Sequence, residues 1–215
     1  MKVKWLGHAC FLLVSGEGLR IITDPYVVDQ NLSYSPIREI ADIVVVSHDH
    51  DDHNNVSAVQ GKPEVLKGSG LKTAKGVQFR GVATYHDTTQ GKQRGTNTVF
   101  CFGLDGIKLC HLGDLGHLLS QAQVNEVGTV DILFIPVGGF YTIDAVGASQ
   151  VCDQLRPKVV IPMHFRTRQC TYPIAGVDNF LRGKKNVKRA DSSEIEFRPE
   201  ELPTATEIVI LKPSS

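Results

Sequence analysis

The stretch VVVSHDHDDHNN, residues 44–55, joins a β-branched run to a dense group of histidines and aspartates. Three of the eight histidines of the chain, His48, His50 and His53, fall within it, and Asp52 stands between the last two. An uninterrupted apolar run of this kind is typical of a strand that is buried on both faces. The stretch therefore predicts a central strand that ends directly in a loop with metal-binding or catalytic chemistry.

The spacing of these side chains suits two cations better than one. In H-x-H-x-D-H at the end of a strand, the alternation of side chains directs His48 and His50 to the same side. After the chain turns, Asp52 and His53 face a second, neighbouring point. Neutral imidazole and carboxylate are ligands for Zn²⁺ and also for Mn²⁺ or Fe²⁺. One cation cannot readily use all four groups from so short a segment, so the pattern favours two divalent ions that take further ligands from other strand ends.

Three other strand ends supply candidates for those further ligands. His86 ends the alternating segment VATYHD, Asp114 follows KLCHLGD, and His164 ends KVVIPMH. Gly113 gives the backbone the freedom to turn the carboxylate of Asp114 inward. Each candidate stands just past an apolar strand, which is where an open site collects its ligands.

Composition limits the class of protein. The chain has 215 residues, of which 41% are hydrophobic, and its 23 basic residues balance 23 acidic ones. This ordinary globular mixture favours no polyanionic partner. The N-terminus lacks the apolar core of a signal peptide, and no window approaches a membrane span. Five cysteines at mostly apolar positions predict buried thiols in a reducing compartment, so we expect a cytoplasmic protein without a membrane partner.

Strands dominate the first half of the chain and alternate with helices in the second. Short apolar runs fill residues 3–46, and residues 97–114 indicate two strands joined by an Asp-Gly hairpin turn. Later, helical spacing over residues 148–155, capped by Asp144, lies between the strands DILFIP and KVVIPM. Residues 166–200 are polar and basic, and we expect an accessory excursion there. This order predicts two mixed sheets packed face to face with helices outside.

Together these motifs resemble the metallo-β-lactamase superfamily. The resemblance covers nearly the whole chain, in family order, and rests on TDP (23–25), HDHDDH (48–53), His86, GD (113–114) and PMH (162–164). More closely, MKVKWLGHACFLL, ADIVVVSHDHDDH, IPVGGFYT and LRPKVVIPMH resemble the short metal-dependent hydrolases related to L-ascorbate-6-phosphate lactonase. The resemblance implies an α/β (α+β) fold with one domain over residues 1–215. That domain would be a four-layer αββα sandwich of two mixed β-sheets with outer helices.

The resemblance also assigns a role to each candidate ligand by position. One metal would be held by His48, His50 and His86, and the other by Asp52, His53 and His164, with Asp114 as the bridge between them. The dinuclear site would lie at one edge of the sandwich.

Two residues near the ligands, Asp24 and His111, are expected to support the site, and the role of His8 is left open. Asp24 would steady the histidine loop, as the family's Asp does at this position, although it could simply cap the turn before Pro25. His111 is a rival for a ligand role, and a buried supporting position is favoured for it. His8 in LGHAC is at least as readily a satisfied core histidine as a catalytic group.

Basic and aromatic residues close to the ligands are candidates for substrate contact. Arg166 and Arg168 are predicted to receive a phosphate or carboxylate of the substrate, and Lys92 and Arg94 offer the same chemistry. An ordinary solvated surface is the default interpretation for all four. Tyr141, on the Gly-rich loop GGFYT, is about equally suited to buried packing and to facing the substrate.

These observations predict a metal-dependent hydrolase. A hydroxide bridging two divalent ions, Zn²⁺ with Mn²⁺ or Fe²⁺ as alternatives, would attack a small ester, lactone or phosphoester. Asp52 would orient or deprotonate the attacking water, and Tyr141 would donate to the developing anion. Two alternatives stay open: a phosphodiesterase or nuclease on RNA or DNA, suggested only by RGKKNVKR (182–189), and a non-catalytic metal-binding protein. A small molecule is the expected partner rather than nucleic acid, and a homo-oligomer is left open.

Overall fold

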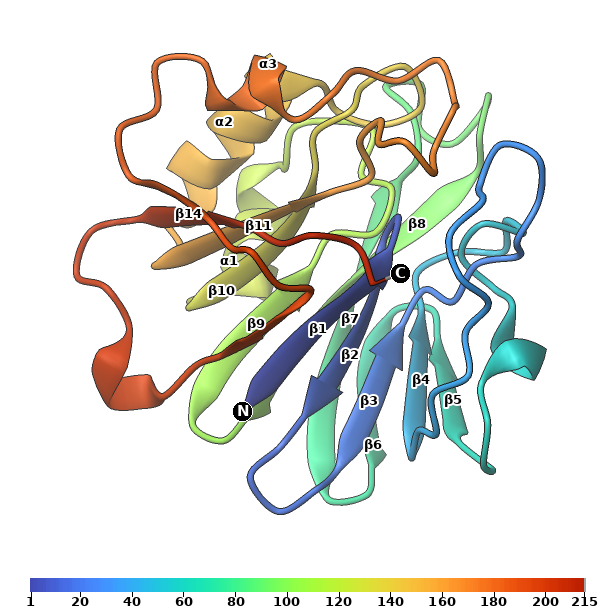
Figure 1. Cartoon of the computed structure of the whole chain (residues 1–215). Helices are drawn as coiled ribbons and strands as arrows, with labels where there is room; N and C mark the ends of the chain where they lie inside the picture. Colours follow the sequence, from blue (N-terminus) through green and yellow to red (C-terminus); the bar gives the residue numbers. More distant parts are fainter. Residues whose placement is uncertain (215) are drawn as a thin grey trace.

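The computed structural model describes residues 1–214, and two β-sheets dominate it (Figure 1). The first sheet has six strands in the order β13-β1-β2-β3-β4-β5. Their bounds are β1 (Lys2–Gly7), β2 (Cys10–Val14), β3 (Arg20–Thr23), β4 (Ile43–Val46), β5 (Glu64–Lys67) and β13 (Glu194–Glu196). Neighbours from β13 to β3 are antiparallel, whereas β3, β4 and β5 are parallel, so this sheet is mixed.

The second sheet has eight strands in the order β12-β14-β11-β10-β9-β8-β7-β6. Their bounds are β6 (Gly70–Ala74), β7 (Val77–Tyr85), β8 (Thr96–Leu104), β9 (Ile107–His111), β10 (Ile132–Pro136), β11 (Val159–Met163), β12 (Val187–Arg189) and β14 (Glu207–Ile210). Strands β6 to β9 are antiparallel, and β9, β10, β11, β14 and β12 are parallel. Both predicted sheets are therefore present and both are mixed.

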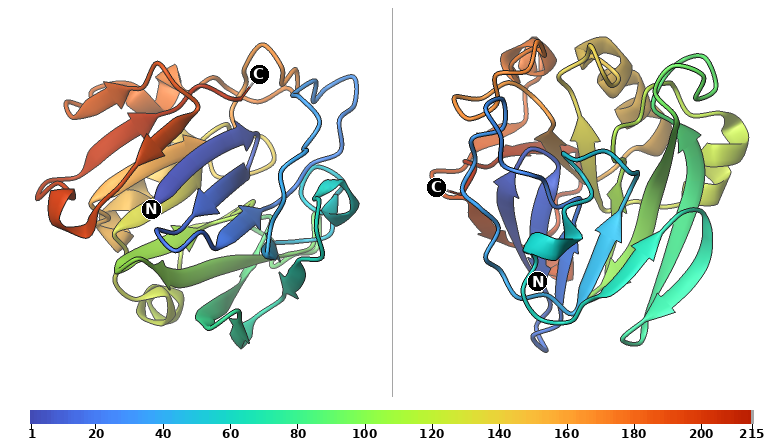
Figure 2. Two further views of the ribbon diagram at one scale, coloured as in Figure 1. Left: turned by 60° about the horizontal axis from the view of Figure 1, so that its bottom comes forward. Right: turned by 90° about the vertical axis from the view of Figure 1, so that its right-hand side faces the viewer.

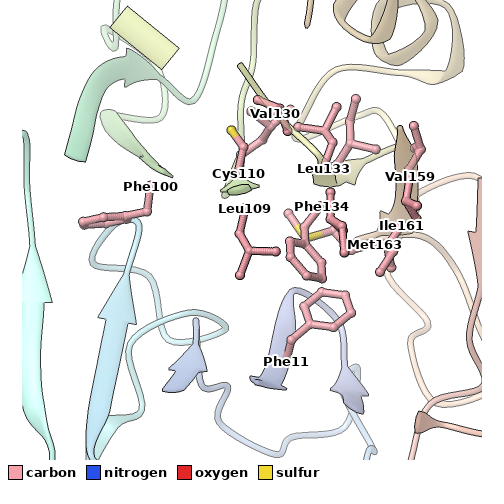
Figure 3. Close-up of a cluster of buried hydrophobic side chains, with 14 of the residues drawn as sticks. Phe11, Phe100, Leu109, Cys110, Val130, Leu133, Phe134, Val159, Ile161 and Met163 are labelled. Atoms are coloured by element: carbon pink, nitrogen blue, oxygen red, sulfur yellow. The ribbon is translucent and has the colours of Figure 1, made fainter. Parts of the chain in front are cut away.

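The two sheets pack face to face over an apolar core. Phe11 on β2 and Phe134 on β10 are fully buried, and their ring centroids lie 4.6 Å apart. Figure 3 shows Phe11 of the first sheet pointing toward Phe134 and Met163 of the second. Every residue of β4, β10 and β11 is buried, as their continuous apolar sequences predict for parallel strands that are covered on both faces. This rigid core fixes the strand ends that carry the site.

Helices and irregular segments form the outer layers. The helices are α1 (Gln121–Val127), α2 (Ala145–Leu155) and the short α3 (Asp178–Leu181). Figure 2 shows α1 and α2 outside the second sheet. The outer face of the first sheet is instead covered by residues 26–41, whose Tyr26 and Tyr34 pack with Val44, and by the 3₁₀ helix η1 (Val56–Ala58). The αββα arrangement is confirmed, with a thin and mostly irregular fourth layer.

Two local predictions of turn and cap chemistry are confirmed. Asp105 and Gly106 both have positive φ, 51° and 77°, and join β8 to β9 as a tight hairpin. The carboxylate of Asp144 accepts hydrogen bonds from the backbone N–H groups of Val146 and Gly147 and so begins α2.

The prediction of an accessory excursion over residues 166–200 is wrong. The segment supplies an edge strand to each sheet, because β12 pairs with β14 and β13 pairs with β1. It also contains α3 and leads into the 3₁₀ helix η2 (Pro199–Glu201). Strands of three residues are too short to show a period in sequence, so their pairing depends on sheet edges formed by distant segments.

The cysteines are free thiols, as predicted. Cys10, Cys110 and Cys170 are buried and the other two are half-buried. Within residues 1–214, no helix combines the length and the apolar character that crossing a bilayer requires.

Candidate metal centre

The candidate ligands meet because several strands end at the same place. His48 follows β4 by two residues, His86 follows β7 directly, and His164 follows β11 directly. Asp114 follows β9 by three residues. These strands belong to both sheets, so the site lies at an edge of the sandwich where the two sheets face each other.

Possible ligand atoms gather there in three overlapping groups, in each of which the atoms lie within 4.8 Å of one another. The groups are His48, His50 and His86; His8, Asp52, His53 and His164; and His48, His53 and Asp114. All seven sequence-predicted ligands are thus brought together. The partition into two sets joined by Asp114 is the one that the resemblance implies, and His8 is an addition to the second set.

Asp114 lies at the centre of this arrangement and is 1% exposed. Its Oδ2 atom is 3.1 Å from His86 Nε2 and 3.2 Å from His164 Nε2. Its Oδ1 atom is 3.2 Å from His53 Nε2. One carboxylate therefore contacts histidines of both predicted metal sets, which is the position that a bridging ligand requires.

Two atoms at the centre test whether the residues fit divalent cations. His53 Nε2 and Asp114 Oδ1 are completely buried and lie 3.2 Å apart, yet they are not hydrogen-bonded to each other and neither has another hydrogen-bond partner among the described residues. Leaving a buried polar atom unpaired is costly, and native structures do so at few places. Convergent imidazole nitrogens and carboxylate oxygens are the donor set of Zn²⁺, Mn²⁺ and Fe²⁺ sites. The residues therefore fit divalent cations.

Asp24 fixes the orientation and tautomer of two candidate ligands. Its Oδ2 atom accepts from His53 Nδ1 at 2.9 Å and from the Ser47 hydroxyl at 2.6 Å, and its Oδ1 accepts from Ser47 N at 2.7 Å. The Ser47 hydroxyl has one proton and donates it to Asp24, so it must accept a hydrogen bond from His48 Nδ1, 2.9 Å away. The network therefore places the protons of His48 and His53 on Nδ1 and leaves each Nε2 lone pair for a cation.

The surroundings of His48 and Asp114 favour the protonation states that bind metal, a neutral imidazole and an ionised carboxylate. Burial lowers the pKa of His48 to about 3, so its imidazole is neutral. Burial alone would raise the pKa of Asp114, but His164 and His53 hold it well below the ordinary value. Burial alone would lower the pKa of His53, but the carboxylates of Asp114 and Asp52 raise it well above the ordinary value. A bound cation would replace the proton that this cluster of carboxylates attracts to His53.

Gly113 turns Asp114 inward, as the sequence predicts. Its φ is +54°, and a Cβ atom there would lie 2.4 Å from Asn97 Oδ1 and 2.5 Å from Ser47 Cβ. The same Asn97 oxygen accepts from Asp114 N at 3.0 Å. Only glycine allows this conformation and this close approach together.

Gly116 tests whether the backbone beside His86 leaves room for a side chain. A Cβ atom there would lie 2.3 Å from Asp87 N and 2.4 Å from the His86 carbonyl carbon, both backbone atoms. We expect Gly116→Ala to displace His86, to lower the free energy of unfolding by about 1–3 kcal/mol and to reduce bound metal. Denaturant titration and elemental analysis measure the two effects.

Gly103→Ala is the matched control for that substitution. Gly103 lies in β8, and a Cβ atom there has no heavy atom within 4 Å. We expect unchanged metal content and equal or higher stability, because alanine in a strand restricts the unfolded chain more than glycine does. Equal behaviour of the two variants would contradict the steric argument for Gly116.

His111 supports the site and has no nitrogen left for a cation. Its Nε2 donates to Ala9 O at 2.9 Å, and its Nδ1 accepts from Gly113 N at 3.2 Å. The residue is 2% exposed, and it lies outside all three groups of possible ligand atoms. The structure therefore favours the buried supporting position over the rival ligand role.

A cavity of about 260 Å³ opens onto the ligands. Its lining residues are His50, Asp52, His86, Arg94, Asp114, Tyr141, His164 and Tyr172. Tyr141 thus faces the site, which favours the substrate-facing interpretation. Arg166 and Arg168 are exposed and do not line this cavity, so their substrate contact stays a prediction.

The structure places three further residues at the site. In the sequence, the default interpretations of His8 and Arg94 are a core histidine and a solvated surface residue, and nothing there identifies Tyr172. His8 Nε2 lies 3.1 Å from Asp52 Oδ2, and the His8 ring lies 4.0 Å from that of His164, centroid to centroid. His8 lies where the β1–β2 pairing is irregular, and its φ is +51°; neither feature can be read from the sequence. Arg94 carried no more signal than Lys92, and Tyr172 carried none, because both reach the site on loops.

A sandwich of two mixed sheets with histidines and aspartates converging at its edge defines the metallo-β-lactamase class. Residues 2–164 match the family model described as Beta-lactamase superfamily domain. A crystal structure from Thermotoga maritima, described as a Zn-dependent hydrolase of the metallo-β-lactamase superfamily, is 40% identical, with a TM-score of 0.81 and coverage of 98% of this chain and 97% of that one. The chain belongs to the metallo-β-lactamase superfamily.

Among curated proteins, the chain is similar to the UPF0173 metal-dependent hydrolases. The relative from Thermoplasma acidophilum is 28% identical, in an alignment that covers 78% of this chain and 84% of the relative. The relative from Hyperthermus butylicus is 27% identical, in an alignment that covers 98% of this chain and 96% of the relative. The similarity to the second relative thus extends over almost the full length of both chains.

Proposed function

We propose that this chain is a metal-dependent hydrolase with a dinuclear site, acting on a small ester, lactone or phosphoester. The observation that carries the proposal is the convergence of two ligand sets on Asp114 beside an open cavity. A purely structural metal site is normally closed, whereas a catalytic one keeps a position open to substrate. The Zn-dependent description of the Thermotoga relative supports Zn²⁺ as the metal.

Two cations held by these ligands would supply an acidified water as the nucleophile and would polarise a substrate oxygen. The carboxylate of Asp52 lines the cavity and accepts from His8 at 3.1 Å. Burial alone would raise the pKa of Asp52, but His53 and then His8 lower it well below its usual range. Asp52 therefore stays ionised and is suited to accept a hydrogen bond from the attacking water and orient it.

Two tyrosines line the cavity and can donate a proton to the anion that develops on the substrate. Tyr141 is the residue that we propose for this step, and its ring lies 5.9 Å from that of Tyr172. Burial raises the pKa of Tyr172, which keeps its hydroxyl protonated. A positioned neutral donor of this kind stabilises negative charge without a compensating cation.

A small substrate fits the site better than a nucleic acid does. The basic segment 182–189 does not line the cavity at the ligands. Its Lys184 and Lys185 line a separate cavity of about 470 Å³ next to Phe180. We therefore place the phosphodiesterase or nuclease second. The resemblance to proteins related to L-ascorbate-6-phosphate lactonase supports including lactones in the proposed substrate class.

Metal content and hydrolysis test the proposal together. We expect close to two metal ions per chain after purification without chelator, and a sharp loss in His50→Ala, which removes a ligand at the cavity. His117→Ala is the control, because His117 lies outside all ligand groups. Its Nε2 accepts from Tyr85 N and its Nδ1 donates to Leu118 O. The metal-loaded proteins would then be assayed on esters, lactones, phosphomonoesters and phosphodiesters.

Three outcomes separate the candidate functions. Turnover of a small substrate that falls with metal loss supports the hydrolase. Two bound metals with no turnover on the whole panel would favour the non-catalytic metal-binding protein. Preferential cleavage of RNA or DNA, with tight and salt-sensitive binding, would promote the nuclease.

A further inference from the structure

We propose that Arg94 binds an oxyanion of the substrate, a carboxylate or a phosphate, while the reacting bond lies at the metal ligands. This inference rests on the proposed hydrolase function and specifies its substrate class. The geometry that carries it is a half-buried guanidinium between two cavities that share a wall.

Arg94 lines both cavities on the ligand side of the molecule. One is the cavity of about 260 Å³ at the ligands, and the other, of about 410 Å³, lies beside it. His50 also lines both cavities, so a molecule that reaches His50 can extend past Arg94. The guanidinium carbon lies 4.5 Å from the centroid of the Tyr141 ring, which holds the side chain against the wall of the site.

The charge of Arg94 is not neutralised by the protein. Among the ion pairs of residues 1–214, none involves Arg94, although the side chain is half-buried. Lys67 lines the second cavity too, but its ammonium lies 2.7 Å from Asp49 Oδ1. A planar guanidinium with free N–H donors matches the two oxygens of a carboxylate or phosphate.

The loop before Arg94 is built to hold this residue in place. The carboxylate of Asp87 accepts five hydrogen bonds from it, two from Thr89 and one each from the backbone N–H groups of Gly91, Gln93 and Arg94, at 2.7–3.0 Å. The N–H of His86 donates to the carbonyl of Gly95, which closes the loop. The backbone at Arg94 is thus fixed relative to His86, and the contact with Tyr141 holds the guanidinium. Such preorganisation lowers the cost of binding.

Binding of inorganic phosphate to the full chain as purified tests the inference without any turnover. We expect calorimetry to show phosphate affinity about tenfold to a hundredfold weaker in Arg94→Gln than in wild type. Arg94→Lys should lie between them, because it keeps the charge and loses the planar fork. Lys92→Gln is the control: it makes the same charge change on the same loop at an exposed residue that lines neither cavity. Equal phosphate affinity in Arg94→Gln and wild type would overturn the inference.

A pair of matched esters tests the same inference during catalysis. The two esters share a leaving group, and one carries a carboxylate where the other carries a carboxamide. We expect wild type to prefer the anionic ester and Arg94→Gln to lose at least tenfold of that preference, mainly through KM. If both esters are hydrolysed and Arg94→Gln keeps the wild-type preference, the role of Arg94 is overturned, whereas the proposal of a hydrolase is still supported. Failure of the metal-loaded wild type on every ester would count against the hydrolase, and the phosphate measurement would still decide the role of Arg94.

Discussion

Asp114→Asn is expected to remove most of the metal and to lower turnover at least a hundredfold. The carboxylate contacts His53 through one oxygen and His86 and His164 through the other. An amide keeps the shape but loses the negative charge and one acceptor, so neither ligand set retains its shared anion. Elemental analysis should show the metal content falling from about two ions per chain to one or none.

The same variant separates metal binding from folding. Without metal, Asp114→Asn removes one of three clustered carboxylates, of which Asp24 and Asp114 are buried and Asp52 is half-buried. His53 keeps its contacts with Asp24 and Asp52. We therefore expect the metal-free variant to be about as stable as the metal-free wild type. With Zn²⁺ at a thousand times its dissociation constant, wild type should gain about 4 kcal/mol that the variant lacks. Thermal melts with and without chelator measure this difference.

Asp131→Asn is the control for Asp114→Asn. Asp131 is also a buried aspartate, but it accepts from Lys108 N and pairs with Lys158, away from the ligands. We expect reduced stability with full metal content. If Asp131→Asn lost metal as Asp114→Asn does, the effect would reflect general destabilisation rather than ligation.

The sequence could predict which side chains gather at this edge because His48, His86, Asp114 and His164 each come within three residues of a strand end. His48, His86 and His164 are located by the strands that precede them, and continuous apolar runs mark such strands well. The packing of the two sheets brings these strand ends together, whatever the conformation of the loops that follow them. The two mixed sheets were predictable for the same reason.

The rest of the site could not be predicted because loops carry it. Arg94 reaches the cavity only because Asp87 folds the loop between them, and no period in the sequence signals such a turn. Arg166 and Arg168 follow a candidate ligand more closely than Arg94 does, yet they are exposed and do not line the cavity. Proximity in sequence to a ligand is therefore a weak guide to substrate contact, since side-chain direction on a loop depends on local hydrogen bonds.

Asp24→Asn is expected to disable one ligand in each metal set although Asp24 touches no metal. Asp24 has a φ of +38°, a conformation that asparagine tolerates, so the backbone should not change. If the amide oxygen keeps the bond from Ser47 N, the amide NH₂ replaces the oxygen that accepts from His53 and from the Ser47 hydroxyl. In the opposite orientation of the amide, its NH₂ group would face the N–H of Ser47, and two donors would meet without an acceptor.

With the NH₂ in that position, protons move onto the atoms that must bind metal. His53 Nδ1 has to accept, which places its proton on Nε2. The Ser47 hydroxyl, now accepting from the amide, donates to His48 Nδ1, which places that proton on Nε2 as well. Loss of such supporting bonds costs about tenfold to a hundredfold in metal affinity, and here both ions are affected. Titration of the metal-free variant with Zn²⁺ against a competing chelator measures each step. Wild-type affinity at both steps would show that something other than Asp24 sets the tautomers of His48 and His53.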